Sequence, residues 1–205
     1  MSVPPQFKIP KNIFFSIGLP GAENTFYQLP EKELIKQTDL SPKDEKEVEK
    51  NQPANFMVKD DITANAFDLS EKNQFIEEKY FDILFQKMIA HFESKPIWIR
   101  DTFLIVGEND KLKTRHISED PKDDLFVLKA FLKPTKEELE NFNPNWYFIN
   151  APHFFATPND GIRDKNFTIV NFTKKVVLIS GVNYTEKSIE RILSDLNSVL
   201  SFDKK

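Results

Sequence analysis

The side chains best suited to proton or metal chemistry are few and widely spaced in this sequence. The three histidines, His91, His116 and His153, are far apart, and no two of them have the spacing of a metal-binding pair. His153 lies in the stretch NAPHFF, which we expect to be a loop, and it is a candidate for the wall of a cleft. The alternative is a loop histidine without a role.

Established catalytic motifs are missing from the chain. It has no GxxxxGK[ST] phosphate loop, no GxGxxG fingerprint, no HExxH zinc motif and no GxSxG elbow. The absence of cysteine excludes disulfides, thiolate nucleophiles and zinc–thiolate sites. The carboxylate pairs Asp60-Asp61 and Asp123-Asp124 fall in polar stretches that we interpret as solvated loops. From the residues alone, no catalytic constellation is predicted.

The hydrophobic pattern predicts a single domain of alternating strands and helices. Apolar residues at helical spacing predict helices over residues 77–92 and 186–200, and a proline-first start predicts a short helix from Pro30. Thr135 and Glu138 form a capping-box pattern at the start of another helix. Compact apolar runs predict strands at residues 12–17, 97–101, 103–106, 112–117, 146–150, 167–172 and 176–180. The fold class is therefore mixed α/β, with a mixed twisted sheet and flanking helices.

Composition and charge restrict the partners that the domain can have. The 205 residues carry a net charge of −4, which argues against a nucleic-acid partner. No apolar run approaches the ~18 residues of a membrane span, and no signal-peptide core is present, so we expect a cytoplasmic protein. Residues 1–11 are interpreted as a flexible arm, residues 12–205 as the domain, and residues 41–54 as an exposed, highly charged loop.

Four segments resemble a known family. They read TDLSPKD at residues 38–44, FDILFQKMIAHFESKPIWIRDTF at 81–103, FLKPTKEEL at 131–139, and a long stretch at 143–200 that includes NAPHFF and NFTKKVVLISGVNYTEK. In this order they resemble the N-terminal lobe of ATP-dependent phosphoenolpyruvate carboxykinase. The resemblance implies that fold, and a family that converts oxaloacetate and ATP to phosphoenolpyruvate, carbon dioxide and ADP with magnesium and manganese.

The departures from the family pattern fall on residues that the resemblance assigns to the substrate side. The arginine of the family's TGRSPKD loop falls at Leu40, which cannot form its charged, bidentate hydrogen bonds. The two lysines of its GEIKK motif fall at Ile189 and Glu190. Arg191 follows Glu190 directly, but a shift of one residue along a helix turns the side chain by about 100°, so Arg191 would point in a different direction from the family's lysine. Tyr184 matches the family's substrate-site tyrosine and is a weak candidate for substrate binding.

These departures favour a degenerate relative without catalysis. The chain stops at Lys205, where the family's catalytic lobe would begin, so we expect no ATP, magnesium or manganese cofactor and no metal site. We expect a stand-alone binding module that forms a homodimer or a complex with another protein. The expected contact is the face that packs on the catalytic lobe in the family.

Two alternatives stay open. The first is one subunit of a split carboxykinase. The second is a sensor of a small carboxylate, with a cleft around Tyr184, His153 and Arg163.

Overall fold

The computed structural model describes residues 18–19, 25–40, 53–68, 75–93, 95–107 and 110–202. The arm expected at residues 1–11 and the strand expected at 12–17 lie outside this part of the chain, as does almost all of the charged loop expected at 41–54. Within the described residues, no helix combines the length and the apolar character needed to cross a bilayer.

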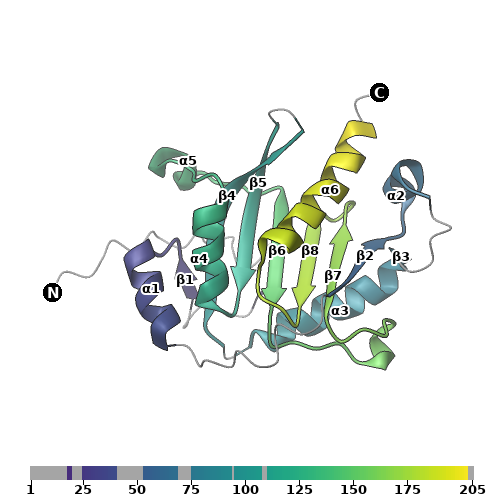
Figure 1. Cartoon of the computed structure of the whole chain (residues 1–205), viewed down its shortest axis with the longest axis horizontal. Coiled ribbons are helices and arrows are strands. Elements are labelled where there is room, and N and C mark those ends of the chain that lie inside the picture. The colour runs from purple at the N-terminus through teal and green to yellow at the C-terminus, as the bar shows by residue number, and fades with distance from the viewer. Residues whose placement is uncertain are drawn as a thin grey trace.

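The described chain forms one mixed sheet with helices on both faces (Figure 1). The strands are β1 Thr25–Tyr27, β2 Ala54–Val58, β3 Phe75–Ile76, β4 Ile97–Val106, β5 Asp110–Ser118, β6 Trp146–Ala151, β7 Phe167–Asn171 and β8 Val176–Ser180. The helices are α1 Glu31–Leu40, α2 Asp61–Ala66, α3 Glu78–His91, α4 Pro121–Ala130, α5 Lys136–Glu140 and α6 Glu186–Phe202, with a 3-10 turn η1 Pro158–Asp160. The predicted fold class is confirmed.

The order of the eight strands in the sheet is β1-β4-β5-β6-β8-β7-β2-β3. Only the β4–β5 and β7–β8 pairs are antiparallel, and the other neighbours are parallel. Residues 103–106 continue the strand predicted at 97–101, so β4 is one long strand that forms a hairpin with β5. Because β5, β6 and β8 run in the same direction, their carboxyl ends meet at one edge of the sheet.

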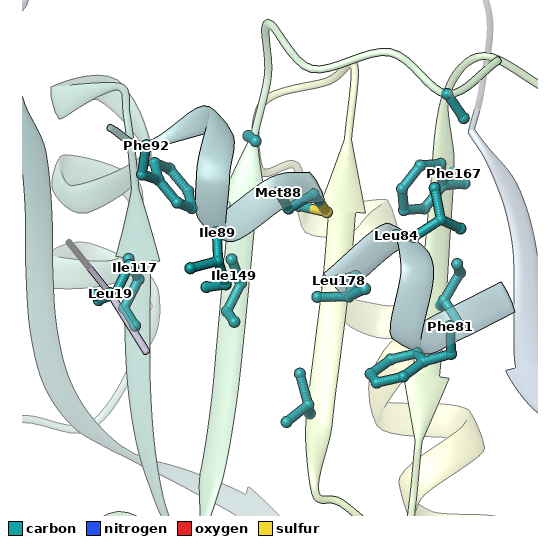
Figure 2. Close-up of a cluster of buried hydrophobic side chains, with 14 of the residues drawn as sticks. Leu19, Phe81, Leu84, Met88, Ile89, Phe92, Ile117, Ile149, Phe167 and Leu178 are labelled. Atoms are coloured by element: carbon teal, nitrogen blue, oxygen red, sulfur yellow. The ribbon is translucent and has the colours of Figure 1, made fainter. Parts of the chain in front are cut away.

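Two apolar layers hold the helices on the sheet. On one face, α3 places the stripe Phe81, Leu84, Met88, Ile89 and Phe92 over buried strand residues such as Ile149, Phe167 and Leu178 (Figure 2). On the other face, α4 and α6 cover a second cluster, to which Val127 and Leu196 contribute. Figure 1 shows α6 lying diagonally across the central strands. The helices predicted at 77–92 and 186–200 are therefore confirmed as α3 and α6.

The interpretation of Asp123-Asp124 as a solvated loop pair is wrong. Both residues lie in the first turn of α4, and both are buried. Asp120 caps this helix by accepting a hydrogen bond from the Lys122 backbone N–H, and Pro121 occupies the first turn. The acidic pair looked solvated because sequence alone does not show which donors will face it. Asp60-Asp61 also begins a helix, α2, with Asp60 as its cap.

Candidate functional site

The candidate site lies at the carboxyl edge of the parallel strands β5, β6 and β8. Loops that follow the carboxyl ends of parallel strands are where α/β proteins bind ligands. His153 follows β6 and Tyr184 follows β8, so the fold brings these two predicted residues to the same edge. Arg163 precedes β7, whose first residue pairs with Ser180 at the end of β8, and its loop therefore reaches this edge too.

A buried carboxylate, that of Asp123, ties these loops together. Its Oδ2 accepts hydrogen bonds from the Ser118 hydroxyl at 2.6 Å and the Asn150 amide at 2.8 Å. Its Oδ1 accepts from the Asn183 amide at 3.1 Å and the Tyr184 backbone N–H at 2.9 Å. One side chain of α4 thus joins the ends of β5 and β6 to the loop between β8 and α6.

A second carboxylate makes the surroundings of Asp123 unusual. Asp120 Oδ2 accepts from the same Asn183 amide, at 3.0 Å, so two carboxylates share one donor. Burial and, to a smaller extent, the charge of Asp120 raise the pKa of Asp123, hydrogen bonds from Ser118, Tyr184 and Asn183 oppose the rise, and the net result is a pKa of about 7. Asp123 therefore changes its charge near neutral pH, which an exposed aspartate does not do.

The side chain of Tyr184 is enclosed, being only 5% exposed. Its hydroxyl lies 3.4 Å from His116 Nδ1, and its ring packs near those of His116 and Phe126. Burial raises the pKa of Tyr184 well above its usual value, and Asp123 adds to the effect. Burial likewise lowers the pKa of His116 to about 3, so the imidazole is neutral. Tyr184 belongs to the second apolar cluster, and His116 packs against two of its members, Phe131 and Phe148, so this pair presents little polar surface.

His153 belongs to a separate cluster around Glu119. The side chain of Glu119 is buried and accepts hydrogen bonds from Lys95 Nζ at 2.7 Å and from the His153 backbone N–H at 2.8 Å. The His91 ring nitrogen lies 3.0 Å from the same carboxylate. Burial alone would raise the pKa of Glu119, but the hydrogen bonds from His91, Lys95 and His153 lower it to about 2. The cluster anchors the loop after β6, while the His153 ring itself is exposed.

The two buried arginines are already neutralised. Arg100 binds Asp124 through Nη2 at 2.9 Å and also through Nε. Arg115 binds Asp101 through Nε at 2.7 Å and Nη2 at 2.8 Å. Because each guanidinium is paired with a carboxylate inside the core, neither one is available to bind an anionic ligand.

The remaining predicted residues do not converge on one point. Ile189 is buried in the apolar cluster beneath α6, and Glu190 is exposed on that helix. Arg191 is also exposed, with its Nε 3.5 Å from Asp195 Oδ1. Leu40 is the last residue of α1, and Arg163 is exposed in its loop.

A resident metal has no evident site in the part of the chain that the structure describes. No group of three or more histidine, aspartate or glutamate side chains there is arranged to hold a metal ion. Asp123 is a poor ligand for a cation, because four hydrogen-bond donors already face its two oxygens. The arrangement is suited instead to binding and releasing a proton.

Sequence reasoning missed the central residue, Asp123, and most of its partners. One signal was available, because Asp120-Pro121 followed by apolar residues at helical spacing marks the start of a helix. That signal would have placed Asp123 in a first turn facing a strand end. No comparable signal exists for Asn150 or Ser118, which are the ends of apolar strands and become partners only when the strands pair.

Similarity to known proteins extends over most of the chain. A family model described as phosphoenolpyruvate carboxykinase matches residues 27–204. Phosphoenolpyruvate carboxykinase (ATP) of Christiangramia forsetii is 37% identical over 164 residues, which are 80% of this chain and 29% of the relative. The enzyme of Flavobacterium johnsoniae is 37% identical over 71% of this chain and 27% of its own length. That of Deinococcus radiodurans is 33% identical over 80% of this chain and 33% of its own. The chain thus spans a third or less of these relatives.

Proposed function

The chain belongs to the phosphoenolpyruvate carboxykinase (ATP) family, and from that premise we propose that it is a carboxykinase-like domain without catalytic activity. In this proposal it binds another protein or a ligand and does not turn over oxaloacetate. The proposal rests on the residues of the substrate side, all of which lie within this chain.

The observation that carries the proposal is the absence of positive charge at the positions where the resemblance places it. Leu40 stands at the position of the carboxylate-binding arginine, and Glu190 stands at that of the metal-binding lysine. Ile189, at the preceding lysine position, is buried beneath α6, where an ammonium group would have to lose its hydration. Oxaloacetate is a dicarboxylate, and its binding needs cations or several aligned donors.

The charges around the candidate site support the same conclusion. Asp120 and Asp123 place carboxylates at the strand ends, and Glu190 is exposed on α6. The buried arginines are neutralised by Asp101 and Asp124, as described above. Where these carboxylates are ionised, they weaken the binding of a dicarboxylate at the strand ends.

The expected loss of oxaloacetate binding is tested by measuring whether the ligand raises the thermal stability of the protein. Thermal unfolding of the full chain would be followed with and without millimolar oxaloacetate and manganese. We expect no shift for the wild type, and stabilisation for Leu40→Arg/Glu190→Lys, which restores two of the three cations. The matched control is Leu40→Gln/Glu190→Gln, which removes the acid without adding positive charge. A ligand present at 100 times its dissociation constant stabilises by about 2.7 kcal/mol, which is easily detected.

Stabilisation of the wild-type protein by oxaloacetate would overturn the proposal. If Tyr184→Phe then abolished the effect, the small-carboxylate sensor would become the better description. The partner is tested by capturing the tagged chain from its native cells and identifying the bound proteins. A partner that carries a phosphate loop, together with carboxykinase activity of the reconstituted pair, would instead establish a split enzyme.

A further inference from the structure

The two oxygens of Asp123 face hydrogen-bond donors of different kinds. Oδ1 is held by the Tyr184 backbone N–H and the Asn183 amide, which both belong to the loop between β8 and α6. Oδ2 is held by the Ser118 hydroxyl and the Asn150 amide at the ends of β5 and β6. A backbone N–H can only donate, whereas an amide or a hydroxyl can turn and accept. On the Oδ1 side the Asn183 amide also donates to Asp120, so turning it would break two hydrogen bonds, and the Oδ2 side is the better place for a proton on the carboxylate.

Asn150 already carries the acceptor that such a proton would require. Its side chain is buried, and its Oδ1 has no hydrogen-bond partner among the described residues. An unpaired buried carbonyl costs free energy and calls for an explanation. Because Asn150 Nδ2 donates to Asp123 Oδ2, a half-turn of the amide would direct Oδ1 at the same carboxyl oxygen. The amide can thus serve the ionised carboxylate in one orientation and the protonated acid in the other.

The electrostatic surroundings make both states of Asp123 accessible. Asp120, a like charge that acts on Asp123, shares the Asn183 amide with it. The neighbouring Asp124 is bound to Arg100, so that arginine does not neutralise Asp123. Burial and Asp120 favour the protonated acid, while the hydrogen bonds from Ser118, Tyr184 and Asn183 favour the carboxylate.

The other titratable groups around this point do not supply a compensating positive charge. On β5, His116 is held neutral by burial, which lowers the pKa of its imidazole to about 3. Glu119 follows β5 and is occupied by Lys95 and His91. Tyr184, in the loop after β8, has a phenol that stays protonated and uncharged, because burial raises its pKa. Protonation of Asp123 thus removes the charge that binds the β8–α6 loop.

We propose that Asp123, Asn150 and Ser118 form a buried proton-binding site whose occupancy controls how firmly the β8–α6 loop is held. In the deprotonated state, the carboxylate accepts all four hydrogen bonds. When a proton from solvent binds Oδ2, the carboxylate becomes a neutral acid and donates to Asn150 Oδ1. The N–H groups of Asn183 and Tyr184 are then left with an uncharged acceptor, which binds them more weakly. The domain would then respond to pH at the loop that leads into α6.

The direct test is a titration of the wild-type chain by nuclear magnetic resonance between pH 5 and pH 9. The Asp123 carboxyl carbon should titrate with a midpoint near 7. The Tyr184 amide should be protected from hydrogen exchange about tenfold less at pH 6 than at pH 8, after correction for intrinsic exchange, because it loses a charged acceptor. A carboxyl carbon that does not titrate in this range overturns the proposal. A titrating carbon with unchanged Tyr184 protection overturns the link to the loop.

A conservative variant separates this effect from general destabilisation. Asp120→Asn keeps a good helix cap and removes the neighbouring charge, so the Asp123 midpoint should fall. Asp61→Asn also removes one negative charge, in the exposed first turn of α2, and serves as the matched control. We expect the midpoint to fall in the first variant only. Equal midpoints in the two variants would show that Asp120 does not act on this site.

Discussion

Arg115 and Asp101 form the most enclosed ion pair described in this fold, and its removal tests the role of buried charge here. Their side chains are 1% and 0% exposed, and two parallel hydrogen bonds join them between β5 and β4. The Tyr27 hydroxyl donates to Asp101 Oδ2 at 2.7 Å. Although burial lowers the pKa of Arg115, its hydrogen bonds and the charge of Asp101 raise it on balance. Arg115 is therefore charged at neutral pH.

The change Arg115→Met removes the cation and leaves the Asp101 carboxylate buried with one donor, Tyr27. Breaking a buried pair in this way costs about 3–5 kcal/mol, which is a large part of the usual stability of a domain. The triple variant Arg115→Met/Asp101→Leu/Tyr27→Phe leaves neither a charge nor an unpaired hydroxyl. Because replacing a whole buried pair with apolar groups is often neutral, we expect the triple variant to recover most of the loss.

The pH dependence gives a second check on the single variant. Without Arg115, burial should raise the pKa of Asp101 in the folded state above its unfolded value. The unfolded chain then releases its proton at lower pH than the folded chain, so stability falls as pH rises through that interval. The Arg115→Met protein should therefore lose more stability at pH 8 than at pH 5.5.

Guanidinium-induced unfolding at both pH values, analysed by linear extrapolation, would measure these differences. A loss below about 1 kcal/mol for Arg115→Met would refute the reasoning, because such a loss is typical of a surface pair. A triple variant as unstable as the single one would also refute it. The cost would then arise from lost packing and not from the unpaired charge.

Three further outcomes are expected. Gly181→Ala should destabilise the fold by about 1–3 kcal/mol, because Gly181 has φ +73° and an added Cβ would lie 2.3 Å from Asn166 Oδ1. Chemical unfolding of Gly181→Ala/Asn166→Gly checks this reasoning, and we expect the double variant to recover part of the loss. Phe81→Ala should cost about 3–5 kcal/mol by creating a cavity under α3, whereas the exposed Ile83→Ala should change the free energy of unfolding by less than about 0.5 kcal/mol. Because the pKa of Glu119 is lowered to about 2, its contribution to stability is present above its unfolded pKa and is lost as pH falls toward 2. Glu119→Gln should therefore make the free energy of unfolding depend less on pH in that range. An unchanged acid unfolding profile would contradict the lowered pKa of Glu119.

Local patterns were sufficient to predict the main elements of the fold. The stripe from Phe81 to Phe92 predicted α3 because residues three and four apart share one face of a helix. The capping box predicted at Thr135 and Glu138 is confirmed, with the Thr135 N–H bound to Glu138 at 2.8 Å. Short elements such as β1 and α2 were not predicted, because their few residues show no clear periodicity.

The sequence by itself determined where α3, α6 and most of the longer strands lie, which family the motifs resemble, and which family positions lack a cation. These properties depend on residue type and spacing within short windows. Only the tertiary structure decided that Asp123 is buried and binds partners from three separate segments. Ser118, Asn150 and Tyr184 meet because β6 lies between β5 and β8 in the sheet, although β7 precedes β8 in the chain. The charge state of Asp123 follows from that meeting, because burial and neighbouring groups set a pKa and residue identity alone does not.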